Sequence, residues 1–141
     1  MSMPPATAPV LLAVEAVNAY YGESHILRNV SFTIEPGEVV CLMGRNGMGK
    51  TTTLKTLTGL LPARSGTITF NGREITQERT DRRARQGLAY VPQGREIIPH
   101  LTVHQNLLLG YWNRPAIPGD VTAQAAFEEV YQLFPKLTQI L

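Results

Sequence analysis

The sequence is poor in cysteine, in aromatic residues and in net charge. Its single cysteine, Cys41, excludes an internal disulfide and favours a reducing compartment. The formal net charge of +2 is too small to indicate a nucleic-acid partner by itself. No apolar run approaches the roughly 20 residues that span a bilayer, and the start of the chain lacks the basic flank of a signal peptide. We therefore expect a cytoplasmic chain that reaches a membrane only through a partner.

The composition is that of a globular protein, because 43% of the 141 residues are hydrophobic and 17% are charged. Three prolines among small residues predict a flexible tail over residues 1–9. The remaining segment, residues 10–141, is long enough for one domain or for part of a larger one.

Strand patterns dominate the first half of the chain. Residues 10–17 and 28–34 predict two strands joined by a turn-rich connection over 18–27. Asn71-Gly72 lies between two alternating runs and predicts a hairpin. The short apolar runs 39–43 and 88–91 predict strands buried on both faces, and Cys41 would be a small buried residue in the first of them.

Helix patterns follow these strands. Residues 50–61 predict a helix ended by Pro62, and 77–87 a polar helix ended by a glycine. Thr102 and Gln105 have the spacing of a capping box. Residues 122–134 predict an amphipathic helix with one apolar stripe. The mixture of strands and helices indicates an α/β fold with an antiparallel β portion.

The stretch "GRNGMGKTT" is the most informative motif. Gly44, Gly49, Lys50 and Thr51 fit the pattern G-x-x-x-x-G-K-[ST]. Glycines let successive N–H groups point at one anion, and the following helix adds its positive end. Lys50 would contact the β- and γ-phosphates, and the Thr51 hydroxyl would coordinate Mg²⁺. The loop therefore predicts binding of a nucleotide such as ATP together with Mg²⁺.

The chain resembles the ATP-binding subunits of ABC transporters. The resemblance rests on "YYGESHILRNVSF", "NGMGKTT" and "GLAYVPQGREIIPHLTV". Within that family it is closest in pattern to subunits that serve bacterial uptake of branched-chain amino acids, with urea and short-chain amide uptake systems as near alternatives. The resemblance implies the N-terminal portion of a P-loop NTPase fold, with an antiparallel β subdomain and an incomplete RecA-like core.

The resemblance also assigns site residues. Tyr21 matches the aromatic residue that stacks on adenine, although Tyr20 is its neighbour. Gln93 matches the glutamine that senses Mg²⁺ and the attacking water. The nucleotide-contacting set is then Tyr21, Gly44, Asn46, Gly47, Gly49, Lys50, Thr51 and Thr52, with Thr51 and Gln93 near Mg²⁺. The segment from Gly94 to Leu101 corresponds to the surface that meets a membrane subunit, with Arg95, Ile97 and Ile98 as contacts or as plain loop residues.

Residues needed for hydrolysis are not recognisable downstream of the loop. None of the acids after Thr51 follows an apolar run of strand character: Glu74, Glu78, Asp81, Glu96, Asp120, Glu128 and Glu129. A signature of the "LSGGQ" type is not found either. We therefore expect the N-terminal part of an ABC ATPase, with permease subunits and a second ATP-binding subunit as partners. The alternative is a nucleotide-binding module without catalysis.

Two further groups of residues, a cluster of arginines and the three histidines, are interpreted as structural or solvent-exposed and not as functional sites. Arg79, Arg82, Arg83 and Arg85 are interspersed with acids and lack aromatic neighbours, so a solvated helix face is favoured over a nucleic-acid surface. The three histidines, His25, His100 and His104, lack metal-ligand spacing and are interpreted as structural.

Overall fold

The protein is described here by a computed structural model that covers residues 10–94, 97–112 and 122–139. The chain divides into two compact units, Met1–Arg83 and Ala84–Leu141. The expected tail, residues 1–9, lies outside the described residues.

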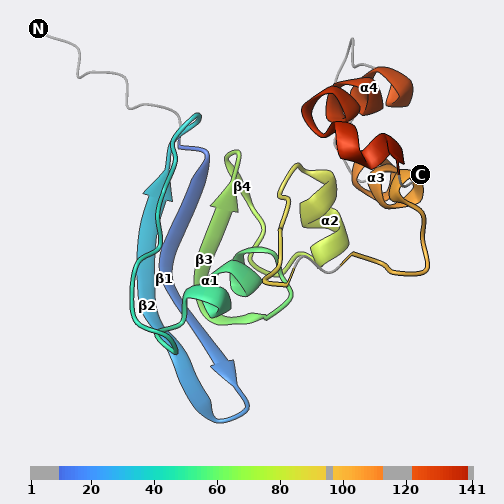
Figure 1. The fold of residues 1–141 in the computed structure, drawn as a ribbon. Coiled ribbons are helices and arrows are strands. Elements are labelled where there is room, and N and C mark those ends of the chain that lie inside the picture. The colour runs from blue at the N-terminus through green and yellow to red at the C-terminus, as the bar shows by residue number, and fades with distance from the viewer. Residues whose placement is uncertain (1–9, 95–96, 113–121, 140–141) are drawn as a thin grey trace, which may run out of the picture. The chain divides into compact units, whose positions relative to one another are not determined.

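A four-stranded antiparallel sheet forms the first unit (Figure 1). Its strands are β1 (Leu12–Tyr21), β2 (Ser24–Ile34), β3 (Ala63–Phe70) and β4 (Arg73–Glu74), in the order β2-β1-β3-β4. Both predicted strands are confirmed, but the predicted connection over 18–27 is wrong. Its residues extend β1 and β2 to a tight turn at Gly22 and Glu23, with Tyr21 opposite Ser24. The alternation was hidden by bulges that change which residues face the core.

The predicted Asn71-Gly72 hairpin is confirmed. Phe70 pairs with Arg73, and both turn residues have positive φ, 49° and 73°. Positive φ at both central positions is the geometry of a type I′ turn, which Asn-Gly favours.

The buried apolar side chains gather on one face of this sheet. They come from all three long strands and from the segments beside them: Leu12, Val14, Val17, Ala19, Leu27, Leu57, Ala63, Ile68, Phe70 and Ile75. Helix α1 (Lys50–Leu57) contacts β2. This face therefore joins the sheet to the segment that carries the glycine motif.

The two strands predicted to be buried on both faces are not strands in the structure. Residues 38–45 and 88–91 have no regular secondary structure, and Val39 is 97% exposed. Cys41 is exposed as well, contrary to expectation. A parallel-type strand needs hydrogen-bonded neighbours on both edges. Among the described residues, the only sheet is the antiparallel one, so neither run has such neighbours.

The remaining helices match the sequence patterns in part: the polar helix expected over 77–87 forms only at 80–85, and no pattern predicted the 3₁₀ helix at 135–139. They are α2 (Thr80–Arg85), α3 (Val103–Trp112), α4 (Ala123–Leu133) and the 3₁₀ helix η1 (Pro135–Gln139). The Thr102 hydroxyl accepts from the Gln105 N–H at 3.2 Å, and the Gln105 side chain accepts from the Thr102 N–H at 2.9 Å. This confirms the capping box. None of the helices in the described part of the chain has the length and apolar character needed to cross a membrane.

Candidate functional site

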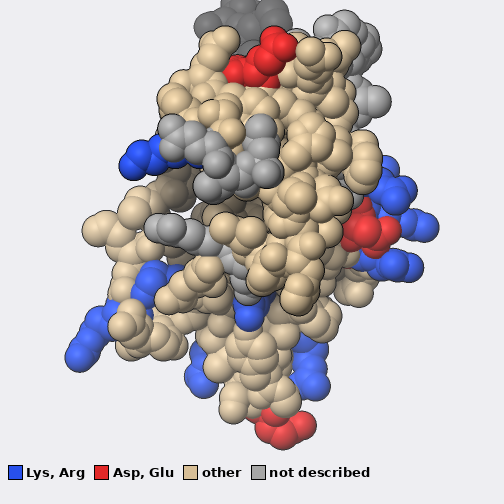
Figure 2. Space-filling view, turned by 45° about the vertical axis from the view of Figure 1, so that its right-hand side comes forward, with Lys and Arg blue, Asp and Glu red and all other residues tan. Residues whose placement is uncertain are grey.

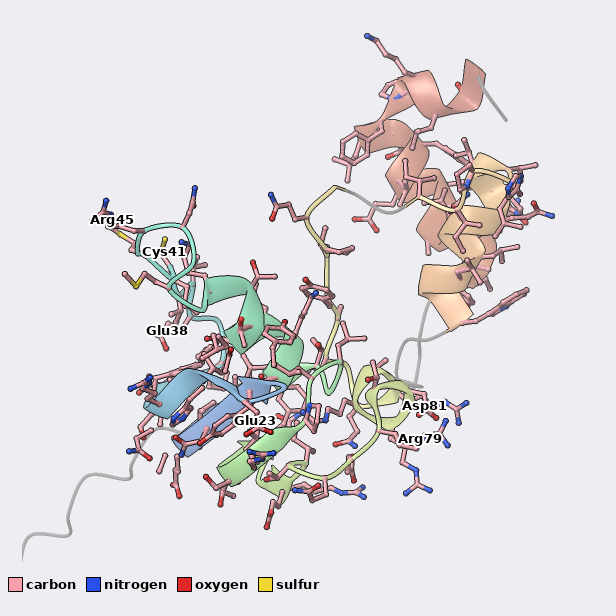
Figure 3. The ribbon with its side chains drawn as sticks, turned by 90° about the horizontal axis from the view of Figure 1, so that it is seen from below. Glu23, Glu38, Cys41, Arg45, Arg79 and Asp81 are labelled. Atoms are coloured by element: carbon pink, nitrogen blue, oxygen red, sulfur yellow. The ribbon has the colours of Figure 1, made fainter. Side chains whose placement is uncertain are left out.

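The lysine of the glycine motif folds back over its own loop. The Lys50 Nζ donates to the carbonyl oxygens of Gly44 at 2.6 Å and Arg45 at 2.8 Å. Cys41 and Arg45 lie on this loop, which leads into α1 (Figure 3). The ammonium charge is thus placed at the loop by backbone bonds, at the N-terminal end of the helix. A cation and a helix N-terminus at one point form a site suited to phosphate.

Gly49 closes the loop and begins the helix. It has φ +87° and is the N-cap of α1, and its carbonyl accepts from the Thr53 N–H at 2.7 Å. A Cβ at this position would lie 3.0 Å from Leu27 Cδ2 on β2. The positive φ and the close approach to the sheet both require glycine here. The end of the loop therefore packs against strand β2 of the sheet.

The threonines after Lys50 divide into two kinds. Thr51 is exposed, and its bond to Mg²⁺ stays a prediction. Thr52 is only 7% exposed, and its carbonyl oxygen accepts from the Thr56 hydroxyl at 2.9 Å. The Thr53 hydroxyl donates to the Gly49 carbonyl at 3.0 Å. Both bonds satisfy buried threonine hydroxyls on the carbonyl oxygens four residues earlier in α1.

The two tyrosines at the end of β1 have different surroundings. Tyr20 stacks on His25, with ring centroids 4.2 Å apart and an interplanar angle of 9°, and the Arg64 guanidinium lies 4.6 Å from the Tyr20 ring. A pocket of about 370 Å³ opens beside Tyr20 and Arg64. Tyr21 is 47% exposed. Tyr20 is thus engaged within the sheet, and Tyr21 has surface to offer a ligand.

Arg83 is the buried residue that sequence reasoning missed. It is 2% exposed and is not part of a solvated face. Its guanidinium donates to four carbonyl oxygens, those of Thr56, Leu57, Thr76 and Glu78, at 2.6–3.0 Å. Burial lowers the pKa of Arg83 from its usual value, and the Glu78 carboxylate opposes that shift. Arg83 therefore ties the C-terminal end of α1 to the chain that follows the sheet.

The other arginines of this segment are consistent with the predicted solvated helix face. Arg79 pairs with Asp81 at 3.0 Å, and the two are neighbours in Figure 3. On the face drawn in Figure 2, blue side chains are scattered among tan ones and form no continuous basic surface over the described residues. Within those residues no group of three His, Cys, Asp or Glu side chains could hold a metal ion.

The glutamine and the predicted membrane-subunit surface belong to the second unit. Gln93 is exposed, as are Ile97 and Ile98, whereas Arg95 lies outside the described residues. Tyr21 and residues 44–52 belong to the first unit, and Gln93 belongs to the other. Its predicted role near Mg²⁺ thus stays a prediction.

The acids downstream of the loop have structural partners or surface positions where they are described. Glu78 pairs with Arg73 at 2.6 Å, and Glu74 is exposed on β4. Glu128 and Glu129 are exposed on α4. Glu96 and Asp120 lie outside the described residues.

Comparison with known proteins gives a consistent result. The family model described as "ABC transporter" matches residues 27–140. The chain is 36% identical over 129 residues to the high-affinity branched-chain amino acid transport ATP-binding protein BraG of Pseudomonas aeruginosa, a match covering 92% of this chain and 54% of BraG. It is 36% identical over 99 residues to the ribose import ATP-binding protein RbsA of Oceanobacillus iheyensis, covering 70% of this chain and 20% of RbsA.

Solved structures show the same fold. A nucleotide-free ATP-binding cassette from an ABC transporter matches with a TM-score of 0.70 and 27% identity, covering 93% of this chain and 56% of the cassette. An ATP-binding subunit of an ABC transporter matches with a TM-score of 0.65 and 34% identity, covering 73% of this chain and 42% of that subunit. The chain thus spans about half the length of BraG and of the first of these structures.

Proposed function

Because the chain belongs to the ABC transporter family, we propose that it binds Mg-ATP through residues 44–52 and serves an importer of branched-chain amino acids. One observation carries the nucleotide proposal: the Lys50 ammonium is held over the loop by the carbonyls of Gly44 and Arg45, at the start of α1. A phosphate group that enters this loop meets a fixed cation and the free N–H groups of a helix N-terminus.

Each loop residue has a defined part in this proposal. Gly44, Asn46, Gly47 and Gly49 supply backbone N–H groups to the phosphates. Lys50 contacts the β- and γ-phosphates as a cation. Thr51 offers an exposed hydroxyl to Mg²⁺, and Thr52 follows it in the first turn. Tyr21 stacks on adenine, and Gln93 senses Mg²⁺ and the attacking water.

The test compares two lysines of the same helix. Lys50→Ala should lower the affinity for Mg-ATP at least about 100-fold, because it removes charge-assisted bonds worth about 1.5–3 kcal/mol each. Lys55→Ala removes a charge of the same sign from α1, more than one helical turn away from Lys50. It should change the affinity for Mg-ATP less than about threefold. Calorimetric titration measures both. Equal affinities of the Lys50→Ala variant and the unchanged chain for Mg-ATP would refute the proposal that residues 44–52, the phosphate loop, bind the nucleotide.

The metal proposal has its own matched pair. Thr51→Ala removes the hydroxyl and should weaken ATP binding only when Mg²⁺ is present. Thr51→Ser keeps the hydroxyl and should bind as the unchanged chain does. An equal loss for Thr51→Ala with Mg²⁺ and with a chelator would place Thr51 outside the metal site.

The transported substrate is proposed from the relatives' names. BraG serves branched-chain amino acids, and a second relative, the uncharacterized amino-acid ABC transporter ATP-binding protein YhdZ of Escherichia coli, is 38% identical over 103 residues. Urea and short-chain amides are the alternative. Uptake of labelled leucine, urea and ribose by source cells lacking the gene separates these: we expect loss of leucine uptake alone. Such a subunit would work on permease partners and with a second ATP-binding subunit, at the cytoplasmic face of the membrane.

A binding module without catalysis is the second candidate. It is favoured by the acids that follow the loop, since Glu78 and Asp81 are paired with arginines in the structure. Phosphoryl transfer depends on groups positioned around Mg²⁺ and water. We expect the 141-residue chain to bind ATP and to show no turnover above its Lys50→Ala variant. Turnover that depends on Lys50 would exclude the module.

A further inference from the structure

Strand β1, which carries Tyr21, has one extra residue relative to each of its two neighbouring strands, β2 and β3. Between the pairs Val14–Phe32 and Val17–Val30, two residues of β1 lie opposite one residue of β2. Between the pairs Glu15–Thr67 and Asn18–Ser65, two residues of β1 lie opposite one residue of β3. Ala16 belongs to both doubled sets and has φ +49°. It is therefore a bulge relative to both neighbouring strands.

The bulge changes which residues of β1 face the core. Before it, Leu12 and Val14 are buried, and after it, Val17 and Ala19 are buried. Side chains of a strand alternate between its faces, so Tyr21 continues the series of Val17 and Ala19. An unbulged strand would continue the series of Leu12 and Val14 instead, to Ala16, Asn18 and Tyr20. The bulge thus decides which tyrosine shares the core face.

That core face is also the face on which the phosphate loop lies. Ala19 pairs with Leu27, and a Cβ on Gly49 would lie 3.0 Å from Leu27 Cδ2, with Ile26 Cγ2 farther away at 3.6 Å. Tyr20 is on the opposite face, where it pairs and stacks with His25 and lies under Arg64. The alternation therefore puts Tyr21, and not Tyr20, on the side of Gly49.

Two side chains bond to the bulge: the Ser31 hydroxyl accepts from the Ala16 N–H at 2.8 Å, and Asn18 bonds to Ala16 and to both neighbouring strands. The two hydrogens of Asn18 Nδ2 are shared among three acceptors: the Ala16 carbonyl at 2.9 Å within β1, Asn29 Oδ1 at 3.0 Å on β2 and Ser65 Oγ at 3.0 Å on β3. Its Oδ1 accepts from the Asn29 N–H at 3.1 Å and is 2.9 Å from His25 Nε2. Asn29 has φ +49°. Asn18 is thus bonded to the extra residue of β1 and to the strained residue of β2.

The neighbouring strand leaves room for this arrangement. Gly66 of β3 has φ +90°, and a Cβ on it would lie 2.5 Å from the Ala16 carbonyl oxygen. The bulge therefore needs glycine opposite it. The geometry is built from both sides and is not an isolated irregularity of β1.

We propose that Asn18 is a positioning residue for nucleotide recognition: by holding the Ala16 bulge, it places the Tyr21 ring, in preference to Tyr20, on the adenine side of the phosphate loop. The proposal rests on the proposed ATP binding and deepens it. Asn18 itself touches no nucleotide atom in this account. It acts on the base through Tyr21 and leaves the phosphate contacts unchanged.

The test measures base preference, the ratio of the dissociation constant of inorganic triphosphate to that of ATP, both with Mg²⁺. Tyr21→Ala should lower this ratio by roughly 5- to 150-fold, the range found for stacked bases. Asn18→Leu, which removes every bond of the amide, should lower it nearly as much. Triphosphate affinity should change less than about threefold in both variants. Val14→Ala is the control, because it weakens the same strand without touching the bulge, and its ratio should stay unchanged.

A deletion supplies the rescue. Removing Ala16 from the Asn18→Leu variant makes the pairs Val14–Phe32, Glu15–Ser31 and Val17–Val30 consecutive, so β1 alternates without an extra residue and Tyr21 stays on the core face, while the register shifts of β2 beyond Val17 remain. The base preference should return to within about threefold of the unchanged chain. A chain weakened in a general way would not recover on losing a further residue.

Three results would overturn the proposal. An unchanged ratio in Asn18→Leu beside a lowered ratio in Tyr21→Ala would show that Asn18 does not position Tyr21. A failed rescue would show that the bulge is not the route. An unchanged ratio in Tyr21→Ala would refute the adenine contact itself, and the proposal with it. If Asn18→Leu does not fold, Asn18→Asp replaces it, since the carboxylate keeps the bond from the Asn29 N–H and loses the donors to Ala16 and Ser65.

Discussion

The two units differ in how much apolar surface they bury. In the described residues, every buried hydrophobic side chain except Phe127 belongs to the first unit. In the second unit, Phe127 contacts His104 and Tyr111 edge to face, beside an apolar pocket of about 510 Å³ between α3 and α4. The Tyr131 hydroxyl there is buried without a hydrogen-bond partner in the part of the chain that the structure describes. Stability therefore resides in the sheet and in the residues that tie α1 to it.

The strongest way to break this contrast is Arg83→Ala. It leaves several buried carbonyls without a donor, and each costs about 1–3 kcal/mol, so we expect a loss of at least about 3 kcal/mol in the free energy of unfolding. Urea titration followed by circular dichroism measures it. Arg82→Ala is the matched control, because Arg82 is exposed in the same helix, and it should change stability by less than about 0.5 kcal/mol. Equal losses would mean that Arg83 stabilises only by charge.

A pair of valines sharpens the contrast inside the first unit. Val14 is 2% exposed on β1, and Val39 is 97% exposed before the loop. Val14→Ala should cost about 1.5–3 kcal/mol, and Val39→Ala less than about 0.5 kcal/mol. Both are measured by the same urea titration. A loss at Val39 comparable to that at Val14 would show that residues 38–43 are buried in solution.

The second unit should respond weakly to loss of its helix cap. The Thr122 hydroxyl accepts from the Ala125 N–H at 3.3 Å at the start of α4. Thr122→Ala should cost about 1 kcal/mol locally. Amide hydrogen exchange of residues 125–130 should accelerate about fivefold, while exchange in β1 stays unchanged. Faster exchange in both places would show that the two units unfold together.

The exposed apolar run should matter for association more than for stability. Val39 and Met43 are largely exposed beside half-exposed Val40 and Leu42. Such a patch favours aggregation and binds hydrophobic dyes. The double variant Val39→Ser and Met43→Ser should lower dye fluorescence about twofold or more, with nearly unchanged unfolding. Unchanged fluorescence would show that the dye binds elsewhere, in the pocket between α3 and α4. Leu108→Ser, which alters the lining of that pocket, should then lower the fluorescence.

The sequence predicted the parts of the fold that short-range chemistry decides. Asn71-Gly72 requires a particular turn, and Thr102 with Gln105 satisfies a helix end, so both could be read locally. Residues 39–43 and 88–91 could not, because an apolar run becomes a buried strand only where other strands pair with it. Arg83 gave no signal, since a charged residue in a polar helix is usually solvated.

The site divides in the same way. Lys50 and Gly49 were predicted because the motif itself encodes the loop, and the structure places both at the start of α1. The proposed choice of Tyr21 over Tyr20 rests on a bulge four and five residues earlier, and no local pattern at Asn18 predicts that bulge. Gln93 lies in the other unit, so its assignment remains with the resemblance.

The contact between Gly49 and Leu27 has a consequence for protein engineering. The loop is defined in sequence by nine consecutive residues, but its last glycine lies 3.0 Å, measured from an added Cβ, from a side chain of β2. Residues 44–52 transplanted to another scaffold would thus keep the motif sequence but lose the β2 side chain against which Gly49 packs. A portable version has to include the β1–β2 hairpin, and a library of loop variants has to keep glycine at position 49 and randomise position 27 together with the other loop residues.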